Sequence, residues 1–116
     1  PPDMQIAAAD SKAAVDQLVA LGYIDEPDAD QHKAVEQTVR ELDYNLAGAY
    51  IDGGIFTEAI LLLERLYQQW PMEHRFGAKL RHCYQNLGRV TDLRRVTDTI
   101  IQRRLEEAEG AVNELA

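Results

Sequence analysis

Residues 40–73 read RELDYNLAGAYIDGGIFTEAILLLERLYQQWPME, and this stretch decides the fold. Apolar residues recur at helical spacing on both sides of Gly53-Gly54, and Pro71 ends the second run. Residues three and four positions apart lie on one face of a helix, so the stretch predicts two amphipathic helices joined by a tight turn. Glycine permits such a turn, and proline cannot continue a helix.

The stretch that follows repeats this arrangement without a gap. Residues 74–107 read HRFGAKLRHCYQNLGRVTDLRRVTDTIIQRRLEE. The matched pairs are Leu46 and Leu80, Tyr50 and Tyr84, Gly54 and Gly88, Phe56 and Val90, Ala59 and Leu93, and Leu66 and Ile100. A fixed period of this length is typical of stacked helix–turn–helix units.

The repeated pattern resembles the tetratricopeptide repeat (TPR) family over residues 40–104. The consensus positions supplied by residues 40–73 are Leu46, Ala47, Tyr50, Gly54, Phe56, Ala59, Leu63, Leu66 and Pro71. The second repeat departs from the consensus at four positions, which are Arg81, Leu93, Thr97 and Leu105. Such departures are typical of a terminal repeat, because the last unit of a stack covers only one face.

The resemblance implies an all-α fold in which antiparallel helix pairs stack as a right-handed TPR superhelix with flanking cap helices. We expect an N-terminal cap helix and acidic turn over residues 1–30. Two TPR units, about 40–73 and 74–107, occupy most of 31–104, and a helical tail covers 105–116. Roughly three repeats are usually needed for an independent stack. Flanking helices, self-association or a parent protein would therefore have to cover the ends.

The apolar pattern and the Gly and Pro positions predict five helices. Their expected bounds are about 11–21, 30–52, 57–70, 72–87 and 92–104, with frayed turns beyond. Asp10 or Ser11 is suited to cap the first helix, and Gly22 to end it in a left-handed conformation. The third helix is apolar over much of its circumference, which predicts burial on most sides. The residues responsible are Ile60, Leu61, Leu63, Leu66 and Tyr67. Gly110 favours fraying of the tail.

The charge of the chain restricts its partners. A net charge of -8 over 116 residues argues against nucleic-acid binding, which requires a surplus of Lys and Arg. Residues 65–104 nevertheless carry a net charge of +6, against -10 before them and -4 after them. This asymmetry favours an acidic protein partner or a homo-oligomer, although solvated outer helix faces explain the same charges.

No membrane span, catalytic centre, cofactor site or metal site is predicted. No run approaches the roughly 20 apolar residues of a spanning helix. Cys83 is the only cysteine, and on a helix it points about 100° away from His82. We expect it to be a small core residue. His32 and His74 lack ligand spacing, and the acidic run 25–30 predicts turn and N-cap chemistry rather than a calcium loop. The chain is therefore expected not to be an enzyme.

The TPR resemblance implies a groove, lined by the first helix of each repeat, that holds a peptide or partner segment. Family members that bind a chain-terminal carboxylate use an Asn of one repeat and two basic residues of the next. The candidate groove residues here are Asn45, Arg75, Lys79, Arg81, His82 and Tyr44. Gly48 leaves room for a partner's backbone or for close helix packing. The predicted function is that of a non-catalytic protein–protein interaction module. The alternative interpretation of the basic groove candidates is that they are ordinary solvent-exposed residues on a helix surface.

A second resemblance concerns residues 18–24, LVALGYI. Catalytic domains of the alkaline phosphatase and sulfatase superfamily end in a similar segment, and some carry TPR units after it. This implies a C-terminal accessory or oligomerisation domain of such a hydrolase. The chain opens Pro1-Pro2 without Met, which suggests a fragment of a longer protein. A helix ended by Gly22, with a hydrophobic contact beyond it, explains the segment equally well.

Overall fold

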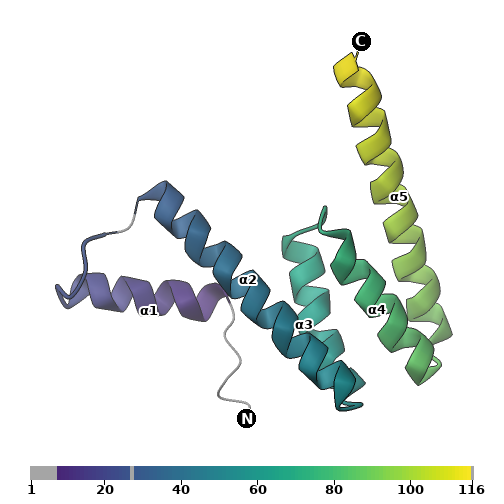
Figure 1. Ribbon diagram of the computed structural model, residues 1–116, viewed down its shortest axis with the longest axis horizontal. Helices are drawn as coiled ribbons and strands as arrows, with labels where there is room; N and C mark the ends of the chain where they lie inside the picture. The colour runs from purple at the N-terminus through teal and green to yellow at the C-terminus, as the bar shows by residue number, and fades with distance from the viewer. Residues whose placement is uncertain (1–7, 27, 116) are drawn as a thin grey trace. The chain divides into compact units, whose positions relative to one another are not determined.

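The computed structural model describes residues 8–26 and 28–115, which form five α-helices and no strand (Figure 1). The helices are α1 (Ala8–Ala20), α2 (Ala29–Asp52), α3 (Phe56–Gln69), α4 (His74–Leu87) and α5 (Val90–Leu115). The predicted all-α fold class is confirmed for this part of the chain.

The chain divides into two compact units, Pro1–Leu46 and Ala47–Ala116, with the boundary inside α2. The first unit holds α1 and most of α2. The second holds the last turns of α2 together with α3, α4 and α5. This boundary cuts through residues 40–73, so the pairing of helices within that repeat stays a prediction.

The end of α1 is the one predicted for a glycine-terminated helix. Gly22 has a φ of +77°, and its N–H donates to the Val19 carbonyl at 3.0 Å. The Tyr23 N–H donates to the Leu18 carbonyl, also at 3.0 Å. These two bonds make the Schellman motif, which satisfies carbonyls that the helix leaves unpaired. The motif accounts for the local sequence 18–24, and the resemblance to hydrolase domain ends stays a prediction.

The start of α1 differs from the prediction. The helix begins at Ala8, so Asp10 and Ser11 lie within its first turns and the proposed cap at either residue is wrong. By contrast, the acidic run before α2 does supply an N-cap. The Gln31 N–H donates to Asp28 Oδ1 at 2.8 Å, and the Asp28 N–H donates to Gln31 Oε1 at 2.9 Å. This reciprocal pair is a capping box.

The sequence period is present in the backbone of the second unit. Gly54 (φ +73°) and Gly88 (φ +67°) end α2 and α4 in the left-handed region that side chains with a Cβ avoid. Each is followed by the same 6→1 bond, from Ile55 to Tyr50 at 2.7 Å and from Arg89 to Tyr84 at 2.9 Å. Helices α3 and α5 also begin at a matched pair of positions, Phe56 and Val90. The glycine turns, and the starts of the helices that follow them, thus recur at the predicted period.

The core of the second unit lies around α4, which packs against both α3 and α5. Its buried residues include Ala59, Leu63 and Leu66 of α3, Phe76, Leu80, Cys83 and Tyr84 of α4, and Val96 of α5. The prediction that Cys83 is a core residue is confirmed. The prediction that α3 is buried on most sides holds for Ile60, Leu63, Leu66 and Tyr67, which are buried, and fails at Leu61, which is exposed.

Two further helix bounds differ from prediction. Helix α4 begins at His74 rather than Met72, because residues 70–73 form a turn closed by the Glu73 N–H on the Trp70 carbonyl at 3.1 Å. Helix α5 runs to Leu115, so the expected fraying around Gly110 is not observed. Its last turns are rich in Glu, Ala and Leu, whose helix propensities offset the roughly 1 kcal/mol cost of a single glycine.

Two of the second repeat's departures from consensus have a simple structural reason. In the first repeat Ala47 and Ala59 are almost completely buried. At the matching positions Arg81 is exposed and Leu93 is half-buried, so neither site has to be small. A longer side chain is tolerated where no other helix covers the position.

Candidate functional site

The candidate site is the solvent-facing side of α4. Its fourteen residues include three Lys and Arg and no Asp or Glu, in a chain whose net charge is -8. Four of the predicted groove residues lie on this helix, at positions 75, 79, 81 and 82. Successive residues of an α-helix turn by about 100°, so Lys79 lies about 40° from Arg75 and about 60° from His82. They form one stripe, which we call the α4 basic face (Arg75, Lys79 and His82).

Arg75 is already engaged at the start of the face. Its Nε donates to Glu73 Oε2 at 3.2 Å, and its guanidinium carbon lies 4.9 Å from the centre of the Phe76 ring. The ring fixes the guanidinium through a cation–π contact. Lys79 differs, because its exposed ammonium makes no hydrogen bond or ion pair with any described residue. Lys79 is therefore the cation of the face most available to a ligand.

His82 connects the basic face to the beginning of α3. Its ring meets the Phe56 ring edge to face, with the centroids 6.2 Å apart and the planes at 63°. Asn86, one turn further, donates from Nδ2 to the His82 carbonyl at 2.8 Å. The imidazole thus has a defined position while remaining exposed. A ligand on the face would meet a cation at Lys79 and an aromatic edge at His82 and Phe56.

The remaining groove candidates are Arg81, Tyr44 and Asn45. Arg81 is exposed, but it lies about 160° around α4 from Lys79 by helix geometry. Tyr44 and Asn45 belong to the first unit, so the juxtaposition of Asn45 with Arg75 and Lys79 stays a prediction. Gly48 has no neighbouring atom within 4 Å of an added Cβ, which argues against close helix packing as its role.

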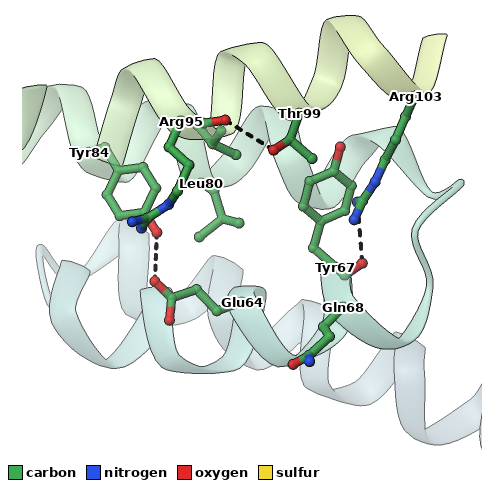
Figure 2. A pocket seen from close by; sticks show the side chains of 9 residues that line it. Glu64, Tyr67, Gln68, Leu80, Tyr84, Arg95, Thr99 and Arg103 are labelled. Atoms are coloured by element: carbon green, nitrogen blue, oxygen red, sulfur yellow. Dashed lines mark hydrogen bonds between the residues drawn. The ribbon is translucent and has the colours of Figure 1, made fainter. Parts of the chain in front are cut away.

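A separate groove, of about 300 Å³, opens between α3 and α5 above Leu80 and Tyr84 of α4 (Figure 2). Its rim is charged: Glu64 lies on α3, and Arg95 and Arg103 lie on α5. These charged groups are occupied by internal partners. Arg95 pairs with Asp92, and Glu64 accepts a hydrogen bond from Tyr84.

Arg103 closes one end of this groove. Its guanidinium carbon lies 4.1 Å from the centre of the Tyr67 ring, and its Nη1 donates to the Tyr67 carbonyl at 3.5 Å (Figure 2). The same Nη1 also donates to the Pro71 carbonyl at 3.4 Å. Those carbonyls belong to the last turn of α3 and the turn after it, where no helical N–H reaches them. Arg103 therefore connects α5 to the end of α3.

Tyr84 crosses the floor of the groove. Its hydroxyl donates to Glu64 Oε1 at 2.6 Å (Figure 2). The Arg89 guanidinium carbon lies 5.1 Å from the centre of the Tyr84 ring. Burial, followed by the Glu64 carboxylate, raises the pKa of the Tyr84 phenol. Sequence reasoning assigned Tyr84 only as a repeat position. Glu64 and Arg103 carried no sequence signal, because their partners lie 20 and 36 residues away.

The described residues offer little for nucleophilic or metal chemistry. Burial raises the pKa of the Cys83 thiol, which disfavours the reactive thiolate. Among residues 8–26 and 28–115, no three His, Cys, Asp or Glu side chains converge as metal ligands would. In the same part of the chain, no helix combines the length and apolarity of a membrane span.

Comparisons with known proteins do not assign this chain to a family. No family model, curated protein or solved structure matches the chain.

Proposed function

We propose that the chain is a non-catalytic protein interaction module that binds an acidic peptide segment along the α4 basic face. The observation that carries this proposal is the α4 basic face, which places two cations, Arg75 and Lys79, on one side of a helix without acidic residues and leaves the Lys79 ammonium uncommitted. In a chain of net charge -8, such a face is a local cationic patch that attracts segments rich in Asp and Glu.

The TPR resemblance supplies the geometry for this proposal. We infer that residues 40–104 form two TPR units, in which the first helix of each unit faces the ligand. Two repeated features support this arrangement: the left-handed glycines 54 and 88, and the matched starts of α3 and α5. The right-handed superhelix, and the participation of Tyr44 and Asn45, follow from the resemblance and remain part of the proposal.

Lys79→Glu tests the proposal, with Arg81→Glu as the matched control. Both residues are exposed on α4 and both substitutions change the charge by two units, but only Lys79 lies on the basic face. The probe is a fluorescein-labelled decapeptide with four glutamates and a free C-terminus, titrated by anisotropy at low salt. We expect Lys79→Glu to weaken binding about tenfold, equivalent to about 1.4 kcal/mol, and Arg81→Glu to weaken it less than twofold.

Two outcomes would contradict this assignment. Equal losses in the two variants would mean that the probe senses net charge rather than a face. Unchanged affinity in Lys79→Glu, with α-helical circular dichroism intact, would remove the basic face as the site. The same peptide with an amidated C-terminus distinguishes two modes of binding. A clamp on the terminal carboxylate predicts that amidation lowers the affinity, and recognition of the glutamate side chains alone predicts an unchanged affinity.

A further inference from the structure

The C-terminal half of α5 carries an apolar stripe that the packing of α5 on α4 leaves exposed. Ile101, Leu105, Val112 and Leu115 expose 54%, 54%, 64% and 89% of their surface, and Ala108 completes the series. The spacing of the five residues is four, three, four and three. This is the a/d spacing of a two-stranded coiled coil, with Leu105 and Val112 at a and the other three at d. We call these five residues the α5 stripe.

The face of α5 that packs on α4 is a different one. Val96 of α5 is buried, and His74 of α4 contacts Glu107 of α5 at 2.8 Å between Nε2 and Oε2. By helix geometry Val96 lies about 140° around the axis from Ile101. The stripe therefore faces away from α4 and is available to a second helix along about 22 Å of its length.

The surface of the stripe contains a hole of the kind that such a helix fills. A shallow hollow of about 260 Å³ is lined by Leu105, Ala108, Glu109, Val112 and Asn113. The first four stand at positions i, i+3, i+4 and i+7, which is the set of four residues that receives one knob in coiled-coil packing. The small side chain of Ala108 leaves the middle of the hole open.

We propose that the α5 stripe pairs in parallel with the α5 stripe of a second copy of this chain. In this register Arg104 occupies a g position and Glu109 the following e position. A parallel pair brings Arg104 of each copy to Glu109 of the other, which gives two symmetric ion pairs. An antiparallel pair would place Glu109 beside the e-position Gln102 and would lose both. The proposal is independent of peptide binding on α4.

Cysteine cross-linking tests both the partner and its orientation. In a parallel, in-register pair the a residues face each other within reach of a disulfide. Leu105→Cys and Val112→Cys should each cross-link alone, doubling the mass from 13.1 kDa to about 26 kDa on a non-reducing gel, at least tenfold faster than Glu106→Cys. Glu106 is the matched control on the outer face of α5, and the native Cys83 is buried.

Two results would overturn the proposal. Cross-linking that appears only in an equal mixture of Leu105→Cys and Ala108→Cys would mean an antiparallel pair, because a positions then face d positions. Rates no faster than that of Glu106→Cys would mean that the stripe does not self-associate.

Charge reversal in the native-cysteine chain gives an independent check. By sedimentation equilibrium, Arg104→Glu should raise the dimer dissociation constant at least fivefold. Adding Glu109→Arg should restore the native value, because the exchanged charges again attract each other across the pair. Failure of the double variant to restore association would contradict the assigned register.

Discussion

Residue 77 of α4 is a glycine, and the side chains of Tyr67 and Ile100 pack against its backbone. A Cβ built on Gly77 would lie 2.9 Å from Ile100 Cγ1 and from Tyr67 Cζ, and 3.0 Å from the Tyr67 hydroxyl. These distances are shorter than real contacts between such atoms. The missing side chain thus lets Tyr67 of α3 and Ile100 of α5 approach the same point of the α4 backbone.

We predict that Gly77→Ala destabilises the fold by about 1–3 kcal/mol, because the added methyl group forces Tyr67 or Ile100 out of place. Gly48→Ala is the control: its Cβ meets nothing within 4 Å, so the gain in helix propensity should stabilise by about 0.5–1 kcal/mol. Urea denaturation monitored by circular dichroism measures both changes. Stabilisation by both substitutions would contradict the close packing at Gly77.

Tyr84 makes stability depend on alkaline pH. Its phenol pKa is raised above the ordinary value of 10.0 by burial and by the adjacent Glu64 carboxylate. A group whose pKa is higher in the folded state stabilises the fold below its unfolded-state pKa, and this contribution is lost as pH rises above that value. The loss therefore begins near pH 10, where the unfolded chain starts to release the proton and the folded chain retains it.

We predict that between pH 10 and pH 12 the free energy of unfolding of the wild type falls more steeply than that of Tyr84→Phe, by up to about 1.4 kcal/mol per pH unit. At pH 7 Tyr84→Phe should cost about 0.5–1.5 kcal/mol for the lost hydrogen bond to Glu64. Urea melts at each pH, paired with tyrosinate absorbance, measure the difference. Parallel pH profiles of the two proteins would mean that Tyr84 titrates normally.

At the scale of the helices, the sequence correctly predicted those helix ends that depend on a single residue. Gly22, Gly54 and Gly88 end three helices, each with a positive φ and the same pair of capping bonds. Pro71 lies in the turn after α3, as expected for a residue that cannot continue a helix. These predictions succeeded because the conformational limits of Gly and Pro are local and do not depend on the rest of the fold.

The predictions that failed depended on competition or on tertiary packing. Asp10 and Ser11 can cap a helix, but they are also tolerated inside its first turns, so α1 extends to Ala8. The exposure of Leu61 depends on which faces of α3 are covered, which periodicity alone does not reveal. The contacts of Arg103 with the end of α3 arise only when α5 is packed.

The candidate site was predictable only in part, for the same reason. Spacing along one helix predicted that Arg75 and Lys79 share a face. It also separates Arg81 from them once the axis of α4 is known. Whether Asn45 completes a clamp depends on the placement of one unit against the other, which no spacing within a helix determines. The sequence alone did not predict the α5 stripe, because the stripe spans only two heptads and lies partly in an acidic tail that is expected to fray.

At the scale of the whole molecule, the two proposed binding surfaces lie on different helices, the basic face on α4 and the apolar stripe on α5. The cationic surplus of residues 65–104 includes α4, whose exposed face is proposed to hold an acidic segment. The exposed apolar residues in the C-terminal half of α5 form a separate stripe, proposed to pair with a second copy. Because the two surfaces lie on different helices, a dimer would present two α4 basic faces. A partner with two acidic segments would then bind with increased avidity.

Mapping the peptide on the protein by backbone amide chemical shifts is the most direct test of binding on α4. Uniformly ¹⁵N-labelled protein is titrated with the unlabelled acidic decapeptide at low salt, and the shifts are followed residue by residue. We predict that the largest changes cluster at residues 75, 78, 79, 82 and 86, along one side of α4, and disappear in Lys79→Glu. Changes confined to other helices, or no saturable change at any concentration, would contradict the proposed function.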